Sequence, residues 1–146
     1  MEHTAYLALG TNLGDKERNI LEAYRQIELS VGKILRKSSY YHSEPWGFSS
    51  ANDFVNTAIC CSTKLTPRQL LDATQDIERA MGRTMKSEHG EYHDRIIDID
   101  ILYYDDMTVE EPDLRIPHPL MKERPFVMIP LGEIRNDSNN TDRKSN

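Results

Sequence analysis

The segment Arg95-Ile96-Ile97-Asp98-Ile99-Asp100-Ile101-Leu102-Tyr103-Tyr104 predicts a β-strand that is apolar on one face and acidic on the other. Successive side chains of a strand point to opposite faces. Asp98 and Asp100 are therefore expected to point the same way, with Cα atoms roughly 7 Å apart. The residues expected to point the other way, into a core beneath helices, are Ile97, Ile99, Ile101 and Tyr103.

The rest of the chain predicts two helices and three further strands around this segment. The strands are predicted from apolar or β-branched runs at residues 4–10, 33–43 and 53–63. Apolar residues recur at helical spacing over Lys16–Val31, and again between the cap residue Thr66 and Gly82. The resulting order is β-α-β-β-α-β. It predicts an α+β, ferredoxin-like fold, an antiparallel sheet with its helices packed on one face.

The chain after Asp106 predicts a less regular C-terminal extension. A short helix is expected near 126–134, and residues 136–146 contain no apolar side chain and are expected to form a disordered polar tail. Residues 1–135 are then one domain, in keeping with the usual domain size of roughly 100–150 residues. The stretch 10–14 is predicted to be a tight turn, because it lacks the lysine of a P-loop and the third glycine of a dinucleotide fingerprint.

Composition excludes several classes of protein. The 146 residues include 18 Lys and Arg against 24 Asp and Glu, a net charge of −6, which argues against a general nucleic-acid or membrane-surface binder. There is no apolar run of roughly 20 residues and no signal-peptide pattern at the start. Cys60 and Cys61 are neighbours on a predicted strand, so a mutual disulfide is not expected. A cytoplasmic protein is predicted.

Asp98 and Asp100 predict a magnesium site. Two neighbouring carboxylates repel each other, and a divalent cation relieves that repulsion. Mg²⁺ takes oxygen ligands, commonly one or two carboxylates with waters and substrate phosphates. The alternative is an ordinary solvated sheet face. Basic residues on both sides of the strand favour the metal and suggest a phosphate-bearing ligand, although a surface ion pair would explain any one of them. They are Arg83, Lys86, Arg95, His118, Lys122 and Arg124.

Phe54 and Asn56 suggest a place for a flat heterocycle. Both fall on one face of the strand predicted at 53–63, where the ring offers a stacking surface and the carboxamide offers hydrogen bonds. A core phenylalanine and an edge asparagine would explain the pair equally well. The five histidines show no metal-ligand spacing and no Cys-x-x-Cys is present, so a zinc site is not predicted.

From about residue 4 to 134 the chain resembles the 6-hydroxymethyl-7,8-dihydropterin pyrophosphokinase family. The resemblance is carried by Ala8-Leu9-Gly10-Thr11-Asn12-Leu13-Gly14, Asp53-Phe54-Val55-Asn56, the Arg-x-x-Asp-x-Asp of 95–100, and the Pro-His-x-x-Met-x-x-Arg-x-Phe of 117–126. It implies transfer of the β,γ-diphosphate of ATP to the hydroxymethyl group of the reduced pterin, in folate biosynthesis. It also implies that AMP leaves, that two Mg²⁺ ions assist, and that the enzyme is a monomer.

The resemblance also implies residue roles. Asp98 and Asp100 would bind the metals and, with Arg83 and Arg95, form the catalytic group. The implied ATP contacts are Gln75, Glu78, Arg83, Arg95, Ile101, His118 and Arg124. The implied pterin contacts are Ser43, Trp46, Phe54, Asn56 and Phe126. Tyr92-His93-Asp94 stands where many members have Trp-Gly-Pro, which leaves open the residue of 91–94 that closes over the site. The flanking stretches 43–53 and 82–94 are expected to close over both substrates.

Three other functions are compatible with the same element order. A non-catalytic ferredoxin-like ligand-sensing module would bind without turnover. An RNA-binding domain would need basic and aromatic residues on its sheet, and would be detected by filter binding. A metal-dependent nuclease or phosphatase would use the aspartate pair without ATP-dependent product formation.

Overall fold

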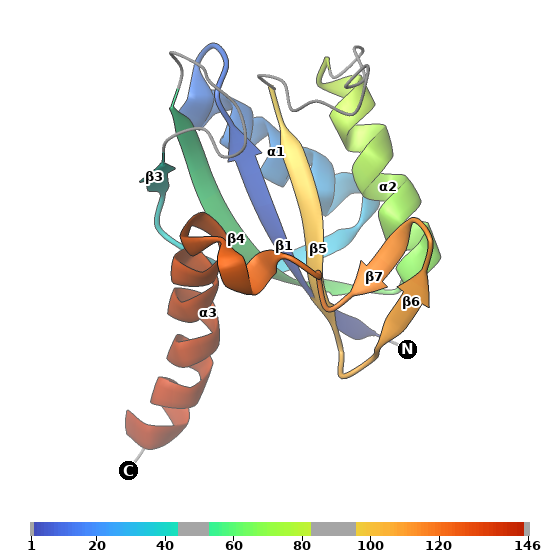
Figure 1. Ribbon diagram of the computed structural model, residues 1–146, viewed down its shortest axis with the longest axis vertical. Helices are drawn as coiled ribbons and strands as arrows, with labels where there is room; N and C mark the ends of the chain where they lie inside the picture. Colours follow the sequence, from blue (N-terminus) through green and yellow to red (C-terminus); the bar gives the residue numbers. More distant parts are fainter. Residues whose placement is uncertain (1, 44–52, 83–95, 145–146) are drawn as a thin grey trace.

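An antiparallel sheet with the strand order β2-β4-β1-β5 forms the centre of the molecule (Figure 1). The computed structural model describes residues 2–43, 53–82 and 96–144, with the backbone alone from residue 136 on. The sheet strands are β1 (His3–Thr11), β2 (Gly32–Lys37), β3 (Tyr41–Ser43), β4 (Phe54–Thr63) and β5 (Asp98–Tyr104), and β3 pairs with the free part of β4. The predicted ferredoxin-like strand order is confirmed.

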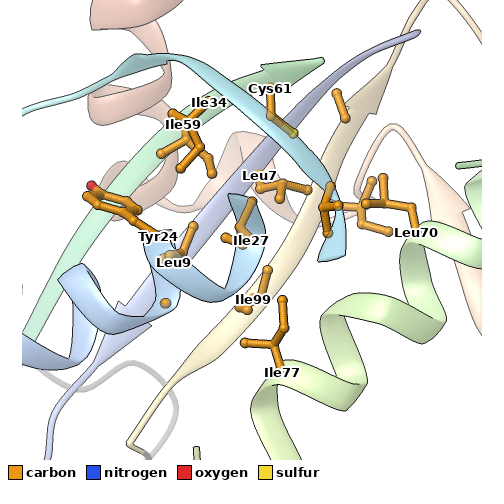
Figure 2. Packing of buried hydrophobic residues seen from close by; sticks show 14 of the residues in the cluster. Leu7, Leu9, Tyr24, Ile27, Ile34, Ile59, Cys61, Leu70, Ile77 and Ile99 are labelled. Atoms are coloured by element: carbon orange, nitrogen blue, oxygen red, sulfur yellow. The ribbon is translucent and has the colours of Figure 1, made fainter. Parts of the chain in front are cut away.

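Helices α1 (Lys16–Ser30) and α2 (Pro67–Ala80) cover one face of this sheet. Both helices begin at a capped residue, and for α2 this is the predicted Thr66. Asp15 accepts from the backbone of Arg18, and Thr66 and Gln69 form a reciprocal capping box. Beneath the helices lies the larger core, to which both helices contribute residues at helical spacing (Figure 2). Its members include Leu7, Leu9, Ile20, Ile27, Ile59, Leu70, Ile77, Ile97, Ile99 and Ile101.

Helix α3 (Pro125–Lys144) packs on the opposite face of the sheet (Figure 1). It buries a second, smaller cluster made of Ala8, Ala58, Cys60, Leu102, Met121, Val127, Leu131 and Ile134. The helix extends beyond its predicted end near residue 134. The residues 136–144, expected to be a disordered tail, continue it as backbone helix. Residues 135–144 contain neither glycine nor proline, so nothing in the chain stops the helix there.

Between β5 and α3 lies a hairpin that the sequence did not reveal. It consists of β6 (Val109–Glu111) and β7 (Leu114–Ile116), and a short 3-10 helix η2 (Met121–Glu123) follows it. Strands of three residues are too short to show periodicity in a sequence. The single strand predicted over 33–43 is also two strands, β2 and β3. They are separated at Ser38. The Ala58 amide donates to the Ser38 hydroxyl, where a regular sheet would have a backbone carbonyl as the acceptor.

The predicted orientation of Tyr103 is wrong because β5 contains a β-bulge. Tyr6 pairs with Tyr103 whereas Leu7 pairs with Ile101, so Leu102 is an extra residue opposite β1. Tyr103 therefore lies on the α3 face, where the Arg135 guanidinium stacks 4.3 Å from its ring centre. Tyr104 takes its place in the larger core and is 1% exposed.

Candidate active site

The strand register places the two aspartates on the sheet face away from α1 and α2. Asp98 pairs with Gly10, which in turn pairs with Asn56 on β4. Cross-strand partners point to the same face, so these positions form a row across three strands. In the next row Asp100 pairs with Ala8. The middle strand thus carries only glycine and alanine between the acidic strand and Asn56 on this surface of the sheet.

Gly10 keeps that surface free of side chains. A Cβ atom at this position would lie 3.1 Å from Asn56 Oδ1 and 3.6 Å from Phe54 Cδ1. Asn56 is held in place because its Nδ2 donates to Ser43 Oγ at 2.8 Å and to the Tyr41 carbonyl at 3.1 Å. Both donor hydrogens of the amide are therefore directed at protein, and its Oδ1 is left facing the row that contains Gly10.

Two basic side chains lie beside Asp100. Arg124 Nη1 is 3.8 Å from one carboxylate oxygen and His118 Nε2 is 4.0 Å from the other. The Asp100 side chain is 30% exposed, whereas Arg124 is 11% and His118 20% exposed. These separations leave an additional ligand room to contact all three groups. Of the six basic residues named from the sequence, His118 and Arg124 thus lie beside Asp100.

His118 is held as a neutral imidazole. Burial, and then the positive charge of Arg124, lower its pKa from the ordinary value of 6.5, while the charge of Asp98 opposes them. Its Nδ1 accepts from the Leu120 amide at 3.3 Å, and its own amide donates to the Leu102 carbonyl. The ring proton is therefore assigned to Nε2, which faces Asp100. His118 offers this site a fixed N–H donor.

The donor set fits Mg²⁺ better than a metal held by protein alone. Within residues 2–43, 53–82 and 96–144, no three His, Cys, Asp or Glu side chains are grouped to hold an ion. Mg²⁺ needs fewer protein ligands, because waters and phosphate oxygens complete its coordination. Asp98 and Asp100 offer carboxylate oxygens from one face of one strand. They fit a magnesium ion that is bound together with a phosphate-bearing molecule.

A cavity of about 380 Å³ adjoins the aspartates between α2, β5 and the β6–β7 hairpin. Asp100 and His118 form its polar end. Its apolar walls include Leu71, Ile99, Ile101 and Leu114. Of these residues the sequence singled out Ile101 as a nucleotide contact. Leu71 and Leu114 were missed, because their role depends on a hairpin that the sequence did not reveal.

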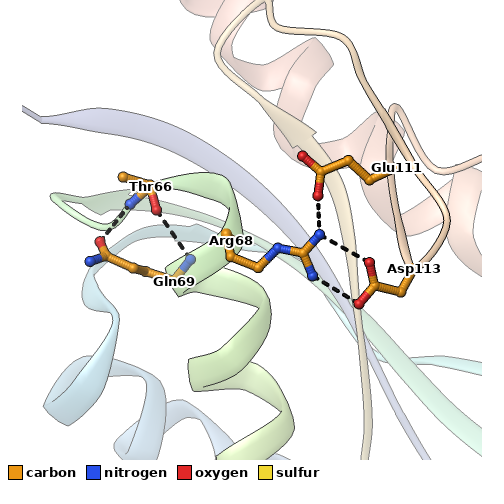
Figure 3. A network of polar contacts seen from close by, with 5 residues as sticks. All are labelled: Thr66, Arg68, Gln69, Glu111 and Asp113. Atoms are coloured by element: carbon orange, nitrogen blue, oxygen red, sulfur yellow. Dashed lines mark hydrogen bonds and ion pairs between the residues drawn. The ribbon is translucent and has the colours of Figure 1, made fainter.

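Arg68 fastens α2 to the hairpin at the rim of this cavity (Figure 3). Its guanidinium binds both oxygens of Asp113, at 2.8 and 3.0 Å, and also pairs with Glu111. The bidentate geometry raises the pKa of Arg68 and lowers that of Asp113. Because Asp113 also lines the cavity, this contact sets the distance between two of its walls.

The other predicted site residues are placed as follows. Glu78 is buried in α2 and its Oε2 accepts from the Ile99 amide at 2.7 Å, whereas Gln75 is exposed one turn earlier. Phe126 is half-buried at the start of α3, 5.8 Å from the Arg124 guanidinium. Trp46, Arg83, Arg95 and residues 91–94 lie outside the described residues, as do nearly all of the two stretches expected to close over the site.

The domain is ferredoxin-like, and at one end of its sheet it carries a carboxylate pair, a buried arginine and a neutral histidine. These are the features of an enzyme that handles phosphate groups with a divalent cation. A family model for 7,8-dihydro-6-hydroxymethylpterin-pyrophosphokinase (HPPK) matches residues 6–136. The chain belongs to this family.

Individual relatives agree with that assignment. The chain is 45% identical over 130 residues to a 2-amino-4-hydroxy-6-hydroxymethyldihydropteridine pyrophosphokinase of Porphyromonas gingivalis, covering 88% of each protein. It is 38% identical over 135 residues to the enzyme of the same name from Bacillus subtilis, covering 92% of this chain and 79% of that one. A crystal structure of wild-type HPPK-DHPS from Plasmodium falciparum has a TM-score of 0.71 at 17% identity. It covers 90% of this chain and 40% of that one, and supports the fold.

Proposed function

We propose that the sheet face bearing Asp98 and Asp100 is where this pyrophosphokinase transfers the diphosphate of ATP to 6-hydroxymethyl-7,8-dihydropterin in folate biosynthesis. The observation that carries the proposal is the row Asn56–Gly10–Asp98, which puts a fixed carboxamide oxygen and the Phe54 ring on the same face of the sheet as a carboxylate pair. Family membership supplies the reaction, and this row supplies the place where both substrates can meet.

ATP is assigned to the side of the aspartates that leads into the 380 Å³ cavity. Its apolar walls suit an adenine ring, and the volume lies in the range of small-ligand pockets, roughly 300–1,000 Å³. The triphosphate then reaches Asp100, where the His118 Nε2–H and the Arg124 guanidinium can donate to phosphate oxygens. When bound at the carboxylates, Mg²⁺ would neutralise phosphate charge and polarise the transferring group.

The pterin is assigned to the side of Gly10 that faces Asn56. The Oδ1 of Asn56 is fixed by the two hydrogen bonds of its amide nitrogen, so it can accept from a ring nitrogen or amino group. Phe54 provides a flat apolar wall next to Gly10, and Phe126 provides a second aromatic surface at the start of α3. These residues orient the hydroxymethyl group toward the phosphates.

The chain's contribution to the transfer is positioning and electrostatic stabilisation. The hydroxymethyl oxygen forms a bond to the β-phosphorus of ATP and loses its proton to solvent, and the bond from that phosphorus to the bridging oxygen of the α-phosphate breaks. AMP leaves with that oxygen. Arg124 and His118 are placed to donate to phosphate oxygens whose charge grows during the transfer, and the buried position of Arg124 strengthens its interaction.

The measurement that tests this function is nucleotide release from ATP and Mg²⁺, with and without the pterin. AMP that appears only with the pterin is the expected result. ADP or free phosphate would indicate a kinase or a hydrolase at the same aspartates. Absence of nucleotide turnover in a folded protein that binds ATP would favour the ligand-sensing module.

The protein is further proposed to act as a monomer in the cytoplasm. Cys60 and Cys61 are free and buried, and burial raises the pKa of the Cys61 thiol to about 12, which suits a protein that forms no disulfides. Over the described residues no helix has the length and apolar character needed to cross a membrane. Sedimentation at micromolar concentration tests the oligomeric state.

A further inference from the structure

We propose that Glu78 is a positioning residue that holds the backbone between Asp98 and Asp100, and that it does not contact ATP. The proposal rests on the assignment of the two aspartates as metal ligands in the proposed function. It changes the role that resemblance implied for Glu78, from a nucleotide contact on α2 to a clamp on the strand that carries the metal ligands.

The strand β5 lies at one edge of the sheet. It pairs with β1 on one side, and in the described parts of the chain no strand pairs with its other side. An edge strand normally leaves its outward N–H groups to water. The Ile99 amide is such a group, yet Ile99 is only 6% exposed. Glu78 Oε2 accepts from this amide at 2.7 Å, and so takes the position that a neighbouring strand would fill.

The environment of Glu78 makes this contact a firm one. The residue is 5% exposed, and a buried carboxylate is costly unless donors surround it. The Ile99 amide donates to Glu78 Oε2 at 2.7 Å, at the short end of the range for an N–H donor and an oxygen acceptor. Its neighbour Ile77, 3% exposed, anchors α2 in the larger core, so the carboxylate is held by a rigid helix.

The consequence concerns the geometry of the aspartates. Ile99 lies between Asp98 and Asp100, so fixing its amide fixes the pleat that sets the separation of both carboxylates. Groups that orient metal ligands typically change metal affinity about 10- to 100-fold when they are removed. A loss of at least about tenfold in metal affinity is therefore expected when the reach of the Glu78 side chain is shortened.

The test separates reach from charge. Glu78→Gln keeps an oxygen at the same distance but removes the charge, and Glu78→Asp keeps the charge but shortens the side chain by one methylene. The exposed Asp76→Ala on the same helix is the matched control. The probe is Mn²⁺, titrated by electron paramagnetic resonance with an ATP analogue whose α,β-bridge is a methylene group. Thermal melts confirm that each variant is folded.

The clamp predicts that wild type, Asp76→Ala and Glu78→Gln bind Mn²⁺ within about threefold of one another, and that Glu78→Asp binds at least about tenfold more weakly. Equal binding by Glu78→Asp and wild type would overturn the proposal. So would a Gln variant as weak as the Asp variant, because that pattern indicates a charge acting directly on the ligand. Absence of Mn²⁺ binding to wild type overturns it as well.

A second measurement does not depend on any variant. The Ile99 amide should exchange with solvent far more slowly than an edge-strand amide, and fast exchange in the wild-type protein would contradict the clamp. Neither measurement requires turnover. A wild-type protein that shows the expected Mn²⁺ pattern but releases no AMP would refute the proposed function and leave the role of Glu78 standing.

Discussion

Replacing Gly10 with alanine should weaken pterin binding and lower stability moderately. The new Cβ would lie 3.1 Å from Asn56 Oδ1, so one of the two must move by a few tenths of an ångström. Asn56 cannot rotate freely, since its amide donates to Ser43 and Tyr41. Losing both hydrogen bonds would cost about 1–3 kcal/mol, and the reduced freedom of the unfolded chain returns about 0.4–1 kcal/mol. At roughly 2–4 °C per kcal/mol, the melting temperature should fall by at most about 10 °C.

The effect on binding should be larger than the effect on stability. The methyl group would stand in the row between Asn56 and Asp98, where the pterin ring is assigned. Forcing an extra methyl into a fitted site costs about 1–3 kcal/mol, which corresponds to roughly a 5- to 150-fold loss of affinity. Calorimetric titration of pterin into enzyme saturated with an ATP analogue measures this loss directly. The KM for ATP should remain within about twofold of wild type if the methyl leaves the phosphate side untouched.

Gly32→Ala is the control for a glycine that matters only for folding. There a Cβ would lie 1.8 Å from the Ser62 carbonyl oxygen, a backbone atom that cannot move aside. A large loss of stability with normal pterin affinity in the folded fraction is expected. If Gly10→Ala bound the pterin as well as wild type, the assignment of the pterin to the Asn56–Gly10–Asp98 row would be refuted. An equal loss of ATP affinity would show that the methyl acts through the aspartates.

Three further predictions follow from the same geometry. Asp98→Ala and Asp100→Ala should each abolish most AMP release and keep a cooperative thermal melt, and wild-type turnover in either variant would remove the metal assignment. The lowered pKa of His118 means that the unfolded chain binds a proton more readily than the native one below pH 6.5. The free energy of unfolding should therefore fall as pH decreases from 6.5, and His118→Gln should flatten that slope in urea titrations at about pH 5–7. Arg68→Ala should raise the KM for ATP several-fold without changing that for the pterin, because it releases one wall of the cavity. Steady-state kinetics with each substrate varied would show whether both values move.

The β5 strand and helices α1 and α2 could be predicted from the sequence, since each has a local cause. The strand 98–104 alternates, α1 and α2 repeat their apolar residues, and Thr66 with Gln69 forms a capping pattern that marks a helix start. The bulge at Leu102 could not be predicted in this way. It depends on how β5 pairs with β1. The bulge turns Tyr103 to the α3 face and Tyr104 to the larger core, which is the opposite of what simple alternation predicts.

The residues of the candidate site likewise fall into those with a local sequence pattern and those placed by the tertiary structure. Asp98 and Asp100 could be found from alternation alone. His118 and Arg124 could be named only as two of several basic residues, because their place beside Asp100 depends on a hairpin with no sequence signal. Glu78 shows the limit most clearly. Its position on a helix face is visible in the sequence, but whether its carboxylate meets a ligand or a backbone amide depends on how α2 lies against β5.

The two faces of the sheet explain why one strand can carry both core residues and catalytic carboxylates. On the helix face, Ile99 and Ile101 are buried in the larger core, and α2 packs against their strand. On the other face α3 packs against the part of the sheet near Ala58 and Leu102, and the half-buried Asp98 and Asp100 are not part of that apolar cluster. If α3 extended over their part of the sheet, it would bury both aspartates. The desolvation and mutual repulsion of two like charges would make this very unfavourable without a cation. The part of the sheet that α3 buries therefore contributes to stability, and the part beyond it can carry the catalytic carboxylates.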